Sequence, residues 1–413
     1  MCCRSAILGA LPSFKQLQGS RTDDWVDRLS HVITVVLIVI LAVVITTAQF
    51  AGEPIHCWHP AEWKKIDWYE DYVENYCWIS NTYVVGFYEA LPTNIYDRKD
   101  REITYYQWIP LVLLLQAFLF KCPNVVWIML HSQGGLNLKK MVKMADQTQL
   151  LDPVQRQDTV ENMAAILDKW LSNERIYKWN RLAVAKKRLS RFCCLFCSKR
   201  NGTYLSGLYT TVKILYLANV IGQFFILNSF MAMNYTVYGF EFLNSLVDNA
   251  PWKANARFPL VTFCDIEIRQ LQNLQTFTIQ CVLPINLFNE KVFVFLWFWM
   301  FFVAIMSFVK LLGWFFTVIL KRHRSQYVRK YLQIAGTADS FTNFERKMFH
   351  RFAHDYLRED GVFVLRTITN NATDLVTTDI VANLWRRFQD RMTAKSSTNR
   401  TSTGETTDEK HDY

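Results

Sequence analysis

Acidic residues are missing from the longest apolar runs of this 413-residue sequence. Four stretches are apolar enough to suggest membrane spans, and none of their cores contains Asp or Glu. A proton-coupled transporter usually carries at least one carboxylate inside its spans, so the sequence disfavours this class. The two halves of the chain also show no inverted repeat of the kind that many secondary transporters have.

The sequence also has no motif that indicates catalysis. It contains no P-loop and no GxSxG nucleophile motif. His350 and His354 have helical i, i+4 spacing, but Arg351 stands where a zincin has Glu, which favours a solvated helix face. CCLFC (193–197) contains one CxxC and no second ligand pair in the same loop. We therefore expect no enzyme activity, no cofactor and no metal site.

Hydrophobic residues make up 51% of the chain, and its mean hydropathy is +0.03. Such values suit a few membrane spans separated by large polar parts. A bilayer core about 30 Å thick needs roughly 20 apolar residues per helix. The sequence therefore predicts an all-α membrane protein whose subunit has four transmembrane helices, at 31–51, 104–130, 209–232 and 291–320. A signal peptide is not expected, because the apolar stretch 6–12 is short and lacks a convincing cleavage site.

The distribution of charge predicts the orientation. The loop 131–208 carries the basic cluster AKKRLSRF (185–192), and KRHRS (321–325) follows the fourth span, whereas the loop 52–103 has ten acidic and five basic residues. Both termini and the loop 131–208 should therefore lie in the cytosol, and the loops 52–103 and 233–290 outside the cell.

Three lysines inside the spans agree with this orientation. Lys121, Lys213 and Lys310 all fall toward the cytosolic ends of their spans, where a long side chain can reach the interface. The net charge of +10 is concentrated next to the membrane. Inner-leaflet lipid, rather than nucleic acid, is therefore the expected counter-charge.

The parts outside the spans are long and differ in character. The loop 131–208 and the segment 321–392 have apolar residues at helical spacing, which predicts a helical cytoplasmic dome, and the tail 393–413 is polar and rich in Ser and Thr, which predicts disorder. The predicted division is an N-terminal segment 1–30, spans 31–51, 104–130, 209–232 and 291–320, extracellular loops 52–103 and 233–290, the cytoplasmic loop 131–208, cytoplasmic helices 321–392 and the tail 393–413.

Four of the ten cysteines fall in the two extracellular loops: Cys57, Cys77, Cys264 and Cys281. An even number of cysteines in an oxidising compartment favours disulfides, but spacing alone leaves all three pairings open. The cytosolic cysteines suit either reduced thiols or palmitoylation. The sequence does not decide between these for Cys2, Cys3, Cys193 or Cys194.

The second span begins with an aromatic cluster and a proline, in YYQWIPLVLLLQAFLFKCP. Tyr105, Tyr106 and Trp108 fit the outer membrane interface, where amphipathic rings are favoured. Pro110 either lies in the first turns, where its missing N–H costs little, or kinks a helix that starts earlier. The sequon at Asn234 follows the third span closely, so we expect little glycosylation there.

Tyr105, Tyr106, Gln107 and Trp108 form the tetrapeptide YYQW, which resembles the signature of the innexins, the gap-junction proteins of invertebrates. Further stretches resemble the same family in the same order, and together they cover roughly residues 20 to 390. These stretches are DDWVDRLS (23–30), FAGEPIHCWHPAEW (50–63), YVENYCWISNTY (72–83), RFPLVTFCD (257–265), CVLPINLFNEKVFVFLWFW (281–299) and YLREDGVFVLRTITNN (356–371).

The resemblance implies a gap-junction channel subunit of the plasma membrane. Innexin subunits, of one or several kinds, would form an octameric hemichannel that docks with one on the adjacent cell and passes ions and small molecules. The resemblance implies the disulfides Cys57–Cys281 and Cys77–Cys264, with some β structure in the loops. It also places Arg4 inside the pore, where a ring of positive charge would disfavour cations.

Two alternatives stay open at this stage. One is an undocked hemichannel that releases small molecules from a single cell, and the other is a junctional adhesion or scaffold protein without conductance. The sequence does not reveal the permeants, the gating stimulus, or whether the partner ring is identical.

Overall fold

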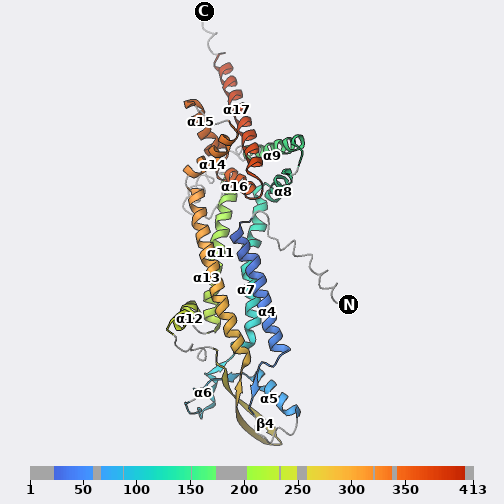
Figure 1. The fold of residues 1–413 in the computed structure, drawn as a ribbon, viewed down its shortest axis with the longest axis vertical. Helices are drawn as coiled ribbons and strands as arrows, with labels where there is room; N and C mark the ends of the chain where they lie inside the picture. The colour runs from blue at the N-terminus through green and yellow to red at the C-terminus, as the bar shows by residue number, and fades with distance from the viewer. Residues whose placement is uncertain are drawn as a thin grey trace, which may run out of the picture. The chain divides into compact units, whose positions relative to one another are not determined.

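The structure is a computed structural model that describes residues 23–58, 67–86, 88–149, 151–173, 202–231, 234–248, 258–319, 321–336 and 342–404. Most of these residues are helical (Figure 1). Four helical stretches are long and apolar enough to cross a membrane: Trp25–Phe50, Tyr105–Gly134, Tyr204–Met231 and Pro284–Thr317. This confirms the predicted fold class, a mostly helical four-span protein with disulfides between loop cysteines and a small sheet.

The elements follow one another in an order that alternates spans with structured loops. The helices are α3 (Trp25–Arg28), α4 (Thr34–Phe50), α5 (Asp67–Ser80), α6 (Ile95–Lys99), α7 (Tyr105–His131), α8 (Leu138–Thr148), α9 (Pro153–Asn173), α11 (Tyr204–Met231), α12 (Tyr238–Val247), α13 (Pro284–Ile319), α14 (Lys321–Ile334), α15 (Asn343–Arg351), α16 (Arg358–Thr369) and α17 (Asp374–Gly404). The strands are β1 (His56–Cys57), β2 (Thr82–Tyr83), β3 (Glu102–Ile103), β4 (Val261–Gln270) and β5 (Asn273–Val282).

The chain divides into two compact units. We call the first the sheet unit, which comprises Leu29–Cys122 and Tyr216–Ser307. The second, which we call the helical unit, comprises Met1–Arg28, Pro123–Leu215 and Phe308–Tyr413. Each long span contributes residues to both units.

In the sheet unit, stretches of α4, α7, α11 and α13 surround a core of aliphatic and aromatic side chains. Tyr106, Tyr235 and Trp297 are among its largest fully buried members. The short helix α12 lies directly on α13. The two helices are so close at Gly239 that an added Cβ would overlap the indole of Trp297, so only glycine fits at this position. Close aromatic packing of this kind replaces the hydrophobic effect as the force between helices that lipid surrounds.

The five strands form one sheet in the order β1-β5-β4-β2-β3. β4 and β5 are a long antiparallel hairpin, in register from Val261–Val282 to Gln270–Asn273. The other three strands come from the loop between α4 and α7, so this one sheet joins both long loops. The sequence did not predict the helices α5 and α6, which belong to the same loop.

The helical unit is built around α16, whose residues are largely buried. Phe352, Tyr356, Trp385 and Phe388 form an aromatic cluster beside it. Asp360 on α16 accepts hydrogen bonds from the backbone N–H groups of Tyr204 and Ser206 at 2.7 and 2.9 Å. Because the first N–H groups of a helix lack partners within it, Asp360 caps α11 from another part of the chain.

The described part of the C-terminus differs from the prediction. The segment 393–413 was expected to be disordered, but α17 continues to Gly404. Extending a helix that has already formed costs much less free energy than nucleating one, so a polar sequence without proline can continue it. Residues 405–413 lie outside the described residues.

Candidate functional site

Two disulfides join the long loops through the sheet. Cys57 on β1 is bonded to Cys281 on β5, and these residues are also direct partners in the strand register. Cys77 on α5 is bonded to Cys264 on β4. These are the pairs that the resemblance implied. The first bond fastens an edge strand to the hairpin, and the second holds α5 against the face of the sheet.

The hairpin alternates buried and accessible residues with the two-residue period of a strand. Cys264, Ile266, Ile279 and Cys281 lie on one face and belong to a core that includes Val73 and Cys77 of α5. Cys57, Cys77 and Cys281 have sulfur atoms close enough for a metal site, but all three are in disulfides. The cluster is therefore covalent scaffolding and offers no thiolate ligand.

The opposite face carries a polar cluster centred on Asp265. Its carboxylate accepts from Tyr83 Oη at 3.0 Å, from Thr278 Oγ1 at 2.6 Å and from the Arg98 guanidinium at 2.9 Å. Burial, together with the negative charge of Asp265, raises the pKa of Tyr83 to about 12. The tyrosine thus stays a neutral donor at physiological pH, and Asp265 fastens both β2 and α6 to the hairpin.

The tip of the hairpin projects an apolar side chain. β4 and β5 are connected through Leu271 and Gln272, and Leu271 is 99% exposed with a φ of 55°. Two-residue hairpin turns favour positive φ, which Gly, Asn and Asp adopt more easily than Leu. An exposed leucine held in a strained conformation at a rigid tip is a candidate contact for another molecule.

Tyr106, Gln107 and Trp108 of the YYQW signature lie in three different environments. Tyr106 is fully buried and lies against Trp78, with ring centroids 4.8 Å apart, whereas Trp108 is 56% exposed. Gln107 donates to the backbone oxygen of Trp78. An interfacial role for all three rings is therefore wrong: Trp108 can face lipid, but Tyr106 is a core residue that joins α7 to α5.

Pro110 explains an unusual contact between two spans. It is the sixth residue of α7 and has no N–H, so it cannot donate to the Tyr106 carbonyl four residues earlier. Gln49 on α4 donates to this carbonyl instead, through Nε2 at 2.7 Å. Gln49 is 5% exposed. The proline thus leaves an acceptor that a polar side chain of the first span satisfies.

Gln49→Leu should destabilise the sheet unit by about 1–3 kcal/mol, because it leaves a buried carbonyl without a donor. In a Pro110→Ala background the restored N–H can reach Tyr106, and the same change should cost much less. A double-mutant cycle on the unfolding of the purified protein measures this coupling. Additive effects of the two substitutions would contradict the account.

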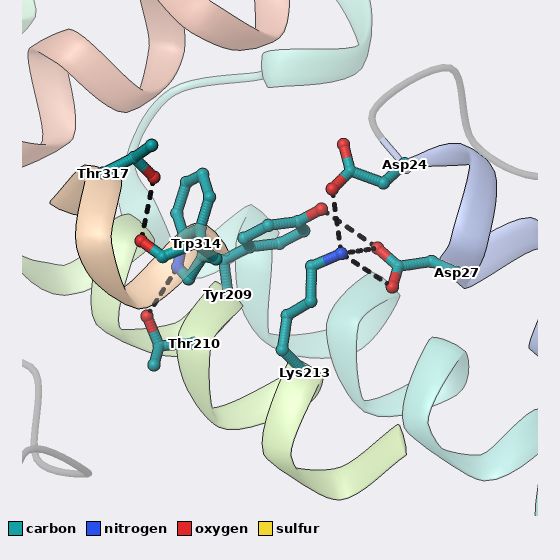
Figure 2. A network of polar contacts seen from close by, with 7 residues as sticks. All are labelled: Asp24, Asp27, Tyr209, Thr210, Lys213, Trp314 and Thr317. Atoms are coloured by element: carbon teal, nitrogen blue, oxygen red, sulfur yellow. Dashed lines mark hydrogen bonds and ion pairs between the residues drawn. The ribbon is translucent and has the colours of Figure 1, made fainter. Parts of the chain in front are cut away.

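A second polar constellation lies inside the helical unit (Figure 2). Lys213 of α11 is 3% exposed, and its Nζ lies 2.9 Å from Asp24 Oδ2 and 2.9 Å from both carboxylate oxygens of Asp27. Tyr209 donates to Asp27 at 2.9 Å, and the ammonium group lies 4.9 Å from the centroid of its ring. One lysine therefore binds two carboxylates at the point where the chain passes into α3.

The charges of this network stabilise one another. Burial acts to raise the pKa of Asp24, but the nearby Lys213 ammonium outweighs burial and holds that pKa below its usual value. Trp314 of α13 donates to Thr210 at 2.9 Å beside the network, and its ring meets Tyr209 edge-on. Lys213 and Asp27 are buried, which strengthens the interaction between their charges.

This network corrects one interpretation of the sequence. Lys213 was expected to extend toward the membrane interface, yet it is buried and paired. The first helical span also begins at Trp25 and so includes Asp27, although predicted span 31–51 contains no acidic residue. The DDWVD stretch ahead of that span was the available signal, because a lysine inside a span requires carboxylate partners.

The remaining candidate residues are only partly covered. Asn234 is exposed and follows the end of α11 at Met231, so its predicted low glycosylation stays a prediction. Arg4 lies outside the described residues, as do Cys2, Cys3, Cys193 and Cys194.

The structure defines a multi-pass membrane protein with four membrane-competent helices. Its two long loops share one sheet, and two disulfides crosslink them. The innexin family model matches residues 23–388. Innexin unc-9 of Caenorhabditis elegans is 35% identical over 382 residues, which cover 92% of this chain and 96% of that protein. Innexin-19 of the same organism is 36% identical, with 89% and 84% covered, and Innexin-3 is 34% identical, with 90% and 84% covered.

The chain belongs to the innexin family. It is a subunit of gap-junction channels and a multi-pass protein of the plasma membrane, in a family of channel proteins rather than enzymes. This assignment does not favour either alternative, the undocked hemichannel or the scaffold protein.

Proposed function

We propose that this chain assembles into an octameric hemichannel whose disulfide-linked sheets dock with those of a hemichannel on the adjacent cell. Ions and small molecules then pass from cytosol to cytosol without chemical turnover. A water-filled passage is needed because transfer of an ion into hydrocarbon costs many kcal/mol. The observation that carries the proposal is the single sheet that both loops build and two disulfides brace.

The orientation follows from the chemistry of the two units. Disulfides persist in oxidising surroundings, so the sheet belongs outside the cell. The basic cluster KRHRS (321–325) follows α13 and belongs to the helical unit, which fits the cytosolic side. With four spans, both termini then lie in the cytosol, and anionic lipid of the inner leaflet is the partner of the basic residues.

Expression of this chain alone in paired cells tests the proposal. We expect junctional conductance and transfer of small dyes between the two cells. Current across single-cell membranes without any transfer between cells would instead support the undocked hemichannel. Absence of both, with the protein at the cell surface, would support a scaffold.

Leu271→Asp should reduce junctional conductance at least about tenfold, because like charges that face each other cost several kcal/mol. Asp adopts positive φ readily, so the hairpin itself should remain folded. Leu271→Asn is the matched control with the same shape and no charge, and it should retain more conductance. If Leu271→Asp and wild type couple cells equally, the hairpin tip takes no part in docking.

Arg4→Glu should increase the preference for cations, because it reverses the charge of a residue that the family resemblance places in the pore. The reversal potential of single hemichannels in a salt gradient measures this preference. Lys15→Glu makes the same change of charge farther along the N-terminal segment and serves as the matched comparison. An unchanged reversal potential in Arg4→Glu would remove Arg4 from the pore.

A further inference from the structure

A small cavity in the helical unit carries more positive than negative charge. It is lined by residues from the end of α13 and from α14 and α16, and it holds about 210 Å³ of empty space including its mouth. Two arginines and a single carboxylate contribute to its wall, which gives a formal excess of one positive charge. The lining residues are Trp314, Thr317, Arg324, Glu359, Val362, Phe363 and Arg366.

The two arginines are unusually poorly paired for their burial. Arg324 is 7% exposed; it donates to Glu359 Oε1 at 3.1 Å, but its Nε has no hydrogen-bond partner among the described residues. Arg366 stacks over the Tyr327 ring at 5.0 Å, and its Nε is likewise buried and unpaired within the described part of the chain. Buried guanidinium donors normally find acceptors, since each orphaned charged donor is costly.

The charges around Arg366 also favour a bound anion. Burial lowers the pKa of this guanidinium, and the positive charge of Arg324 adds to that effect. No salt bridge to Arg366 is present among the residues that the structure describes. An anion placed between the arginines would relieve both the burial cost and the mutual repulsion.

We propose that this cavity binds a phosphate group, supplied by an anionic lipid of the inner leaflet. Guanidinium groups recognise phosphate oxygens through paired N–H donors, and the Nε–H groups of Arg324 and Arg366 lack partners among the described residues. The membrane-competent part of α13 ends at Thr317, so the cavity opens at the membrane boundary. This placement in the inner leaflet rests on the proposed orientation of the channel.

The size and surroundings of the cavity restrict the ligand. The enclosed space is small, so the cavity suits a single head-group phosphate better than a nucleotide. A neighbouring cavity of about 300 Å³ shares Trp314, Phe363 and Arg366, but Asp23 and Asp24 also line it. These carboxylates would repel a phosphate, which leaves the first cavity as the anion site.

The test uses the purified full-length protein in detergent with three probes: dioctanoyl phosphatidic acid, dioctanoylglycerol and inorganic phosphate. We expect binding of phosphatidic acid and none of dioctanoylglycerol, which has the same chains without phosphate. Arg366→Gln should weaken this binding about tenfold or more, as loss of a charge-assisted hydrogen bond requires. Equal binding of phosphatidic acid and dioctanoylglycerol would overturn the proposal.

Arg322→Gln is the matched control, because it removes one positive charge from an exposed position of α14 that does not line the cavity. It should change binding by no more than about twofold. An equal loss in Arg322→Gln and Arg366→Gln would mean general surface attraction and would contradict the site. Arg366→Lys keeps the charge without the planar donor pair, so an intermediate affinity is expected, and it replaces Arg366→Gln if that variant does not fold.

Inorganic phosphate distinguishes the source of the ligand. If it binds weakly and phosphatidic acid binds tightly, the lipid assignment stands. If inorganic phosphate binds equally well and depends on Arg366, the phosphate site stands but the lipid source is wrong. Binding in detergent does not depend on docking or conductance, so a failure of paired-cell coupling would leave this test unaffected.

Discussion

Lys213→Met should destabilise the helical unit by about 3–5 kcal/mol, because it leaves the buried carboxylate of Asp27 and the partly exposed carboxylate of Asp24 without their cation. Lys213 is the only residue within 4 Å that forms a salt bridge with Asp24 or Asp27 in the described part of the chain. Both carboxylates lie where the N-terminal segment joins α3, so channel assembly and current should fall as well. Thermal unfolding of the purified protein measures the loss of stability.

Two controls separate pairing from simple loss of a lysine. Lys143→Met removes an exposed lysine of α8 in the same unit and should change stability by less than about 0.5 kcal/mol. Adding Asp24→Asn and Asp27→Asn to Lys213→Met removes the uncompensated charge, and most of the lost stability should return. Wild-type stability in Lys213→Met alone would show that the network does not hold this unit together.

Removal of the Cys57–Cys281 disulfide should have the other large effect. The bonded residues are 224 positions apart. Because the Cys77–Cys264 bond remains, the crosslink closes a loop of only about 40 residues, for which the chain-entropy account assigns about 4 kcal/mol. The double substitution Cys57→Ser and Cys281→Ser avoids leaving a reactive single thiol. We expect β1 to separate from the hairpin and junctional conductance to be lost, as paired-cell recordings can show.

The matched control for the disulfide is Cys122→Ser, since Cys122 is a free cysteine that is partly buried. This change should leave both unfolding and conductance nearly unaltered. Loss of conductance in Cys122→Ser as large as in the double variant would mean that general thiol chemistry, rather than the crosslink, explains the result.

The spans could be predicted because a run of apolar residues is a local property of the sequence. The hairpin also left a local signal, because Cys264, Ile266 and Ile268 alternate with the charged residues Asp265, Glu267 and Arg269, although no specific strand was predicted there. α5 was missed because its sequence, DWYEDYVENYCWIS, is polar enough to resemble a surface loop. Its apolar side becomes evident only when Val73 and Cys77 meet the sheet.

The polar contacts could not be predicted, because each joins residues far apart in the sequence. Pro110 indicated in the sequence that one backbone N–H would be missing. No residue close to it in the sequence indicated that Gln49 supplies the replacement donor. Likewise, the pairing of Lys213 with Asp27 depends on the fold that brings α11 beside α3. A lysine inside a span needs a counter-charge, and a proline inside a span leaves a carbonyl that needs a donor. The sequence therefore predicts that a partner exists, but it does not identify that partner.

Electron microscopy of the purified full-length protein in lipid most directly tests whether these subunits form docked channels. We expect two eight-membered rings around a continuous passage, in contact through the β4–β5 hairpins of opposing subunits. Isolated subunits, or rings that meet through their helical units, would contradict it.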